Sequence, residues 1–182
     1  MNYIIYDIEA TCWLNNPPDK ISETIEIGAY LLDDYGHVKD KFSKLIRPVI
    51  SQSISSYCTE LTTITQQMLD RSAKFPEVIE DFQDWIGVGY EDYILCSWGA
   101  YDKKQLTIDC RFHHLDTKWL EPHINLKEQY RKMKRMSIGP GLKKIVELEG
   151  YDFDGTHHRG ISDAFNLAKI FARYLGEWDF NC

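Results

Sequence analysis

The sequence predicts an α/β fold in which a mixed sheet of about five strands is flanked by helices. Short β-prone runs come first along the 182 residues, helical segments then alternate with a further strand, and the chain closes on an amphipathic helix. No repeat, low-complexity tract or Pro/Gly/Ser linker divides the sequence, and its 43% hydrophobic content is sufficient for a substantial core. Residues 1–182 are therefore expected to form a single domain.

The strands are predicted from short apolar runs rich in β-branched and aromatic residues. These runs are residues 3–6, 25–32, 41–46 and 93–97. Asp34-Tyr35-Gly36 supplies a turn between the second and third runs, so these two are expected to form a hairpin against the first. A long loop is expected over residues 48–62.

The helices are predicted from their start signals and from apolar residues at helical spacing. The segments are residues 65–70, 76–86, about 100–112, about 126–136, 142–148 and a last helix near the end of the chain. Pro76 suits the first turn of its helix, where the missing N–H costs nothing. The last helix is the clearest, because its apolar residues follow the i, i+3, i+4 stripe: Ala164, Leu167, Ala168, Phe171, Ala172 and Leu175.

The composition of the chain argues against a membrane or secreted protein. No apolar run is long enough to span a bilayer, and the first residues lack the basic region of a signal peptide. The five cysteines are widely spaced without a C-x-x-C pair, which argues against both a structural zinc site and a disulfide framework. We therefore expect a cytoplasmic protein that does not bind a membrane.

The formal net charge of −7 disfavours broad coating of duplex nucleic acid, for which a basic protein is expected. A small footprint at a strand end fits this acidic balance better. Basic residues do cluster along one stretch, and this cluster is either a solvated helix face or a patch that follows phosphates. Its members are Lys127, Arg131, Lys132, Lys134, Arg135, Lys143 and Lys144.

Asp7 and Glu9 follow the first apolar run and are separated by one residue. Alternation along a strand points both side chains to the same face of the sheet, with Ile8 on the other. The alternative is an edge strand that simply ends in polar residues. The pair becomes informative only if other acids join it.

Asp102 and Asp163 each continue the apolar stripe of a predicted helix. Asp102 lies one turn before Leu106, and Asp163 lies four residues before Leu167. The alternative for Asp102 is an acid favoured in the first turn by the helix dipole. A carboxylate turned toward the core needs a partner or a metal, and converging carboxylates are tolerated mainly where divalent cations neutralise them.

His158 precedes Asp163 by five residues, across Gly160, so we place it on a loop that leads into the last helix. A loop histidine, with an unperturbed pKa of about 6.5, can take a proton from water near neutral pH. The alternative is that His157 and His158 are a pair of solvated loop histidines. An oxygen-rich cluster that holds two hard cations, with a histidine beside it, is typical of phosphodiester hydrolysis.

The order of these residues resembles the DEDDh branch of the 3′–5′ exonuclease superfamily (RNase T and DNA polymerase III epsilon-subunit type), whose motifs are D-x-E, a central D and H-x4-D. The motifs here are Asp7-Ile8-Glu9, Asp102 and H-R-G-I-S-D from His158 to Asp163. Three further stretches are similar to Eri-like exoribonucleases and KapD-like proteins: Y-C-T-E-L-T-T-I-T-Q (57–66), I-N-L-K-E-Q-Y (124–130) and G-I-S-D-A-F-N-L-A-K-I (160–170). The resemblance covers nearly all of the chain.

The resemblance implies an RNase H-like fold and a metal-dependent 3′–5′ exonuclease, with RNA as the expected substrate. By resemblance, two Mg²⁺ or Mn²⁺ ions are held by four acids, which are Asp7, Glu9, Asp102 and Asp163. His158 is then the general base, and nucleoside 5′-monophosphates are released from single-stranded 3′ ends or short overhangs of RNA or DNA.

Substrate contacts are also implied by the resemblance. Ala10 and Thr11 match the segment that touches the terminal ribose, and Leu61 and Thr62 match the segment that packs against the last base. Trp13 is a candidate platform for an unpaired base. A core or surface-loop tryptophan is the alternative at that position.

Two other functions stay open at this point. One is a DNA exonuclease of proofreading or repair type, which recognition of the 2′-OH would separate from an exoribonuclease. The other is a KapD-like regulatory protein that acts through a protein partner. A homodimer also stays open as an assembly of this chain. The intact set of mutually repulsive acids speaks against lost catalysis, and so against a purely regulatory binding protein.

Overall fold

The computed structural model describes residues 1–15, 17 and 19–180, and it contains a five-stranded mixed sheet with the strand order β3-β2-β1-β4-β5. The strands are β1 (Asn2–Ala10), β2 (Thr24–Leu32), β3 (Val38–Leu45), β4 (Tyr93–Ser97) and β5 (His123–Asn125). β1, β2 and β3 pair antiparallel, whereas β4 runs parallel to β1 and to β5. The predicted mixed sheet, with its hairpin against the first strand, is confirmed.

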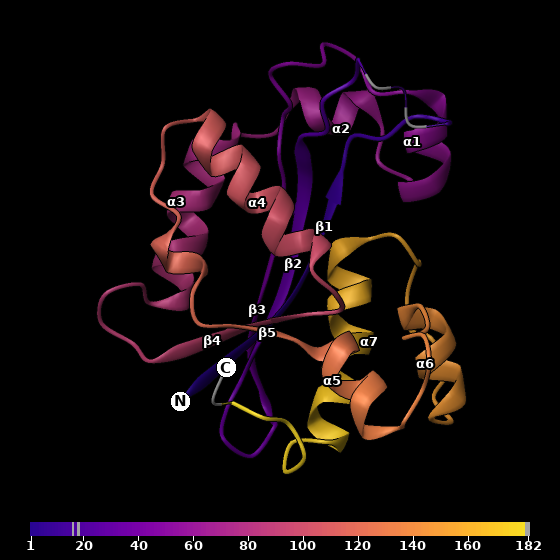
Figure 1. The fold of residues 1–182 in the computed structure, drawn as a ribbon. Helices are drawn as coiled ribbons and strands as arrows, with labels where there is room; N and C mark the ends of the chain where they lie inside the picture. Colours follow the sequence, from indigo (N-terminus) through magenta and orange to yellow (C-terminus); the bar gives the residue numbers. More distant parts are fainter. Residues whose placement is uncertain (16, 18, 181–182) are drawn as a thin grey trace.

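Helices cover both faces of this sheet (Figure 1). Along the chain they are α1 (Ser56–Thr62), α2 (Gln66–Asp70), α3 (Phe75–Ile86), α4 (Tyr101–Phe112), α5 (Leu126–Met133), α6 (Leu142–Leu148) and α7 (Gly160–Arg173). α3 and α4 lie on one face, α5, α6 and α7 lie on the other, and α1 and α2 lie beyond the end of β1. No helix in the described part of the chain is long and apolar enough to cross a bilayer.

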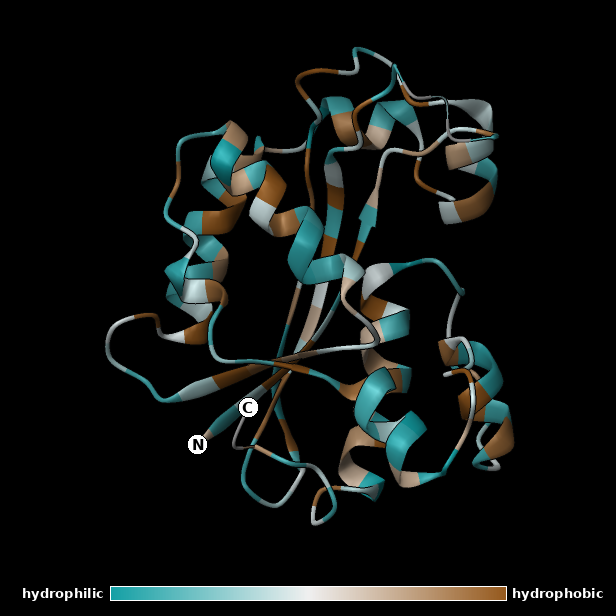
Figure 2. Cartoon of the chain, viewed as in Figure 1, coloured by the Kyte–Doolittle hydropathy of each residue, from teal (hydrophilic) through white to brown (hydrophobic). Residues whose placement is uncertain are grey.

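The two faces of β1 belong to two different cores. Ile4, Tyr6 and Ile8 pack with α3 and α4, whereas Tyr3 and Ile5 pack with α5, α6 and α7. Figure 2 shows that the helices on both faces of the sheet carry hydrophobic (brown) and hydrophilic (teal) residues in alternating stretches, as expected for helices with one side on a core. Since side chains alternate along a strand, the odd-numbered residues that continue β1 face α7. The end of β1 is therefore directed at the start of the last helix.

Two local predictions were wrong, and one strand, β5, was not predicted. The loop expected over 48–62 contains α1, which begins where the Ser55 hydroxyl accepts a hydrogen bond from the Cys58 N–H at 2.9 Å. Only Cys58 and Thr62 of this helix are buried, so the sequence lacks a clear apolar stripe. β5 has three residues, too few to show alternation, and α5 ends at Met133, three residues before the predicted end.

Candidate active site

A pocket of about 280 Å³ opens at the end of β1, and all five acidic and histidine residues of the sequence motifs line it. Its lining residues are Asp7, Ile8, Glu9, Trp98, Tyr101, Asp102, Leu142, His157, His158 and Asp163. They come from β1, from the segment that follows β4, from the first turns of α4, α6 and α7, and from the loop before α7. Residues more than 150 positions apart in the chain thus meet, as predicted.

The strand places Asp7 and Glu9 on one face, where they meet Asp163. One ligand oxygen from each of these three carboxylates lies within 4.8 Å of the other two. Glu9 is 9% exposed and Asp163 only 3% exposed, whereas Ile8 packs into the opposite core. Buried carboxylates at this separation repel one another unless positive charge is supplied.

This repulsion is visible in the acid–base properties of the cluster. Burial, followed by the nearby charges of Asp102 and Asp163, raises the pKa of Asp7 well above its ordinary value. Burial and the charge of Asp163 raise the pKa of Glu9 to about 8. Burial likewise raises the pKa of Asp163. Without cations the cluster favours protonated carboxyl groups.

Asp102 completes the acidic set from α4. It lies in the first turn of the helix, 5% exposed, and its Oδ1 accepts a hydrogen bond from the Ile8 N–H at 3.2 Å. Burial raises the pKa of Asp102 to about 6, although the hydrogen bond from Ile8 opposes that rise. The carboxylate therefore ties the start of α4 to β1 while facing the pocket. The Asp102 carboxylate is not part of the group formed by Asp7, Glu9 and Asp163, whose ligand oxygens lie within 4.8 Å of one another.

Two glycines allow α7 to lie directly on the sheet beside Asp7. Gly28 is the β2 partner of Asp7, and a Cβ added to Gly28 would come within 2.1 Å of the Gly160 carbonyl carbon. A Cβ added to Gly160 would meet the Asp7 carbonyl oxygen at 3.0 Å. This backbone contact brings the first turn of α7, and with it Asp163, over the end of β1.

A buried ion pair, Glu26–Arg159, fixes the same end of α7. The Glu26 carboxylate, 1% exposed, accepts hydrogen bonds from Arg159 Nη2 at 2.8 Å and from the Gly160 N–H at 2.9 Å. Glu26 is also the direct cross-strand partner of Glu9, a position where like charges destabilise. Arg159 and the helix N-terminus offset that repulsion. Sequence reasoning missed both members of this pair.

His158 lies on the loop before α7, as predicted, with its backbone in the left-handed region at φ 64°. Its N–H donates to Asp163 Oδ2 at 2.9 Å, so the loop conformation is tied to the aspartate. Burial and the neighbouring His157 lower the pKa of His158 below its usual value. A neutral imidazole beside the acids is the form that can accept a proton.

Five lining residues were not predicted as site residues: Ile8, Trp98, Tyr101, Leu142 and His157. Trp98 and Tyr101 belong to the segment S-W-G-A-Y-D (97–102) that ends in Asp102, and this proximity in sequence was the available signal. His157 Nδ1 lies 2.9 Å from Asp163 Oδ1, and its ring stacks on His158 with a centroid separation of 3.9 Å. The interpretation of the two histidines as a solvated pair is therefore wrong.

The five predicted substrate contacts are not among the lining residues of this pocket. Thr11 and Thr62 are buried, and the Thr62 hydroxyl donates to the Cys58 carbonyl within α1. Ala10 ends β1, and Leu61 lies on α1. Their assignment to the substrate stays a prediction, in which Ala10 and Thr11 act through the backbone.

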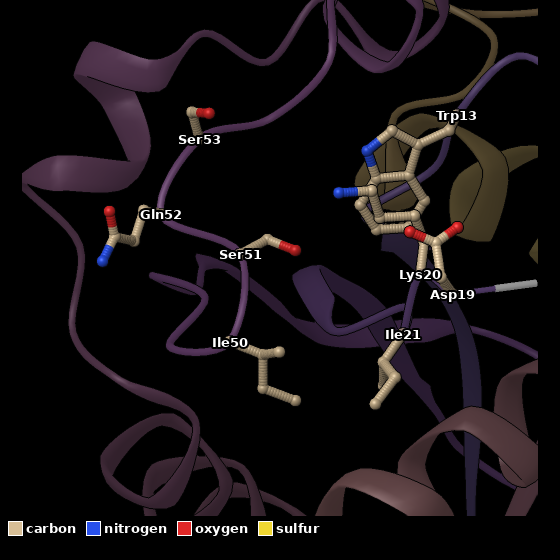
Figure 3. A pocket seen from close by; sticks show the side chains of 8 residues that line it. All are labelled: Trp13, Asp19, Lys20, Ile21, Ile50, Ser51, Gln52 and Ser53. Atoms are coloured by element: carbon tan, nitrogen blue, oxygen red, sulfur yellow. The ribbon is translucent and has the colours of Figure 1, made fainter. Parts of the chain in front are cut away.

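Trp13 lies in a second pocket of about 260 Å³, shown in Figure 3. The indole faces Lys20, whose Nζ is 6.0 Å from the ring centroid, and the opposite wall is the segment from Ile50 to Ser53. The predicted role of Trp13 as a base platform is untested, and any such contact would lie outside the acidic pocket.

The donor set of the acidic pocket fits divalent cations. Carboxylate oxygens are the ligands that hard cations such as Mg²⁺ and Mn²⁺ prefer, and bound cations would remove the repulsion that raises the carboxyl pKa values. Asp7, Glu9 and Asp163 would form the core of such a site, and Asp102 would reach it from α4.

Comparison with known proteins agrees with this geometry. The exonuclease family model RNase_T matches residues 4–171. The human 3′-5′ exoribonuclease 1 is 34% identical over 184 residues, which cover 94% of this chain and 51% of that protein. The chain thus spans about half the length of this relative. The probable 3′-5′ exonuclease KapD of Bacillus subtilis is 27% identical over 157 residues, covering 86% of this chain and 75% of KapD.

Among solved structures, the nuclease domain of 3′hExo, a DEDDh family member bound to rAMP, superposes with a TM-score of 0.89 and 33% identity. The superposition covers 96% of this chain and 92% of that domain. The expected RNase H-like nuclease fold is confirmed by this likeness. The family match, the shared fold and the convergence of the DEDDh residues together establish that this chain belongs to the exonuclease family, within its DEDDh branch.

Proposed function

We propose that this protein is a metal-dependent 3′–5′ exoribonuclease that removes nucleotides one at a time from single-stranded 3′ ends or short overhangs. The observation that carries the proposal is the convergence of four acids and His158 on one pocket. The likeness to 3′-5′ exoribonuclease 1, and to a nuclease domain bound to rAMP, favours a ribonucleotide as the group that enters this pocket.

The chemistry needs a cation site, a base and a positioned phosphodiester. We propose Mg²⁺ or Mn²⁺ as the physiological ions, with Asp7, Glu9, Asp102 and Asp163 as their ligands. When bound by these carboxylates, such ions would supply the positive charge that stabilises the oxygens of a phosphodiester during hydrolysis. His158, whose pKa is lowered by burial, takes the proton from the attacking water. The hydrogen bond from its N–H to Asp163 keeps the base next to the acids.

Aromatic and basic groups around the acids suit a polynucleotide end. Trp98 and Tyr101 line the pocket, and a base that stacks on an aromatic ring gains about 1–3 kcal/mol regardless of its sequence. A second groove of about 510 Å³ shares Leu142, His157 and His158 with the pocket and adds Lys143 and Lys144. The lysines offer charge to the phosphates of the incoming strand.

Most of the remaining basic cluster is paired within the protein. Arg131 binds Glu128 at 2.7 Å, and Lys134 lies 3.7 Å from the half-buried Glu149. The two interpretations of the cluster therefore divide it. The α5 residues Arg131 and Lys132 belong to an ion-paired helix face. The α6 lysines are our candidates for phosphate contacts because they line the groove beside the acids, although Lys144 also lies 3.7 Å from Glu147.

The direction and the sugar preference can be tested with 5′-labelled single-stranded oligonucleotides of matched sequence in RNA and DNA. With Mn²⁺ or Mg²⁺, the RNA is expected to shorten one nucleotide at a time from its 3′ end, with release of 5′-monophosphates. Better cleavage of the DNA would overturn the RNA preference and favour the DNA exonuclease alternative. Internal cuts, or no cleavage of either strand, would overturn the exonuclease itself.

A further inference from the structure

His157 extends the active site with a nitrogen donor that the DEDDh motif does not require. Its Nδ1 lies 2.9 Å from Asp163 Oδ1, and one ligand atom from each of His157, His158 and Asp163 lies within 4.8 Å of the other two. We propose that these three residues form a binding site for a zinc-class transition-metal ion, which overlaps the carboxylate site because both use Asp163.

The donor types distinguish this site from the carboxylate site. Two imidazoles and one carboxylate are a combination that suits Zn²⁺, Ni²⁺, Co²⁺ and Cu²⁺, whereas Mg²⁺ prefers oxygen donors alone. Three protein ligands with one position left for water are also the usual composition of an open zinc site. The two groups of donors in the described residues therefore select different metals, although their pockets are continuous.

Binding one ion requires the His157 ring to turn out of its stack on His158, because an imidazole nitrogen coordinates a metal in the plane of its ring, and it requires only a small change in the ligand distances. Ligand atoms about 2.0–2.2 Å from a tetrahedral zinc ion are separated from one another by about 3.3 Å. His157 Nδ1 and Asp163 Oδ1, now 2.9 Å apart, must separate by a few tenths of an ångström. The side chain of His157 is 32% exposed, so it can move and an ion can enter from the groove beside α6.

Asp163 is held more firmly than His157. Its Oδ2 accepts from the His158 N–H, and the Glu26–Arg159 pair fixes the turn before it. The Asp163 carboxylate can therefore serve either metal site without leaving its place. An ion held by the two histidines would engage both Asp163 and His158, so it would compete with the catalytic arrangement.

Inhibition by zinc in the presence of Mg²⁺ is the expected consequence. This consequence rests on the proposed exonuclease function, whereas binding of the ion does not. A transition metal at this site would make the nuclease sensitive to free zinc. The alternative role for His157 is simpler: the side chain orients Asp163 through its hydrogen bond and binds no metal.

Two variants separate these roles. His157→Gln keeps an N–H donor for Asp163 but replaces imidazole by a poor zinc ligand, and His157→Ala removes both. His37→Ala is the matched control, because His37 Nδ1 also lies beside an aspartate, Asp33, at 3.6 Å, but without a second histidine in the same described metal group. Circular dichroism melts establish that each variant is folded before metal is added.

The experiment titrates the whole protein with Zn²⁺ by calorimetry in millimolar Mg²⁺, and with Co²⁺ by absorption spectroscopy. One zinc ion per chain is expected, with Co²⁺ bands of a tetrahedral nitrogen–oxygen site and no thiolate charge-transfer band. Both His157 variants should weaken Zn²⁺ binding more than about tenfold, since losing even an outer-shell partner costs about 10–100-fold. His37→Ala should leave the Zn²⁺ affinity unchanged.

Unchanged Zn²⁺ affinity in His157→Gln, or displacement of Zn²⁺ by equimolar Mg²⁺, would overturn the site. Thiolate bands would overturn it as well, because they would place the ion on a cysteine. A wild-type protein that binds Zn²⁺ as expected but cleaves no RNA would contradict the proposed function and leave the metal site standing.

Discussion

Replacing Glu26 by glutamine should weaken the site without touching any residue that lines it. The Glu26 carboxylate is 1% exposed and accepts from Arg159 Nε at 3.1 Å, from Arg159 Nη2 at 2.8 Å and from the Gly160 N–H at 2.9 Å. Glutamine retains one acceptor oxygen for Gly160 but turns an N–H₂ group toward a guanidinium. The start of α7 then loses its main polar anchor.

The expected loss of folding stability follows from the burial of the Glu26–Arg159 ion pair. Removing one partner of a buried ion pair costs about 3–5 kcal/mol, and the cost falls to about 2–3 kcal/mol here because the Arg159 side chain is 25% exposed and can be rehydrated. For a chain of this length, 1 kcal/mol lowers the melting temperature by about 2–4 °C. Glu26→Gln should therefore lower it by about 5–10 °C.

To separate an effect on the site from a general loss of stability, the experiment needs a control variant that loses a similar free energy of unfolding. Glu149, 9% exposed at its side chain, binds Arg173 at 3.0 Å and accepts from two tyrosine hydroxyls, so Glu149→Gln should cost similar stability. Arg173 ends α7, about 20 Å from Gly160 along the helix axis. Only Glu26→Gln disturbs the first turn that carries Asp163.

The assay measures Mn²⁺ affinity by calorimetry and RNA cleavage at a temperature where both variants are fully folded. Glu26→Gln should weaken Mn²⁺ binding and lower kcat more than about tenfold, as expected when an outer-shell partner is lost. Glu149→Gln should retain both. Equal loss of activity in the two variants, or a melting temperature unchanged in Glu26→Gln, would refute the role given to the Glu26–Arg159 pair.

Three other outcomes are expected. His158→Ala should slow RNA cleavage about 100-fold or more, as loss of a general base does, while Mn²⁺ affinity changes little; loss of Mn²⁺ binding would make the histidine a required ligand. The pKa of Glu9 is about 8 in the folded protein against an ordinary 4.5, so the folded state favours the protonated form. Without metal, the stability that Glu9 contributes is therefore complete below about pH 4.5 and is lost as the pH rises toward 8. Mn²⁺ should accordingly raise the melting temperature more at pH 8 than at pH 5. A metal-free melting temperature that rises with pH would contradict this prediction. Gly28→Ala should yield little folded protein, because its Cβ would lie 2.1 Å from the Gly160 carbonyl carbon, and a soluble, active variant would show that α7 can shift.

The DEDDh residues could be found from the sequence because each obeys a local rule. Asp7 and Glu9 share a strand face, and Asp163 continues the stripe of α7, so the direction of these side chains, and the burial of Glu9 and Asp163, follow from periodicity. His158 was placed on a loop because of its spacing from Asp163, and the structure confirms that placement. Their meeting in space rested on the family resemblance, since no local pattern encodes which strand faces which helix.

Other parts of the site depend on contacts that no local pattern reveals. Glu26 sits in an apolar strand and is explained only by Arg159, which lies 133 residues later. Gly28 does not lie in a turn, and a glycine is required there because the backbone of α7 approaches β2 closely. His157 looks like a solvated loop residue until its contact with Asp163 is known. These residues support the site through tertiary packing.

The central claim is that the four acids bind cations that drive cleavage of RNA from its 3′ end, and the most direct test compares Asp7→Asn with the wild type. The variant removes a carboxyl group whose charged form is disfavoured by burial and by four neighbouring acids, so its metal-free melting temperature should equal or exceed that of the wild type. Release of 5′-monophosphates from a 3′-extended RNA should fall at least about 100-fold, the scale of losing one group that stabilises developing charge. Undiminished release by folded Asp7→Asn, or release by the wild type without divalent cations, would contradict the claim.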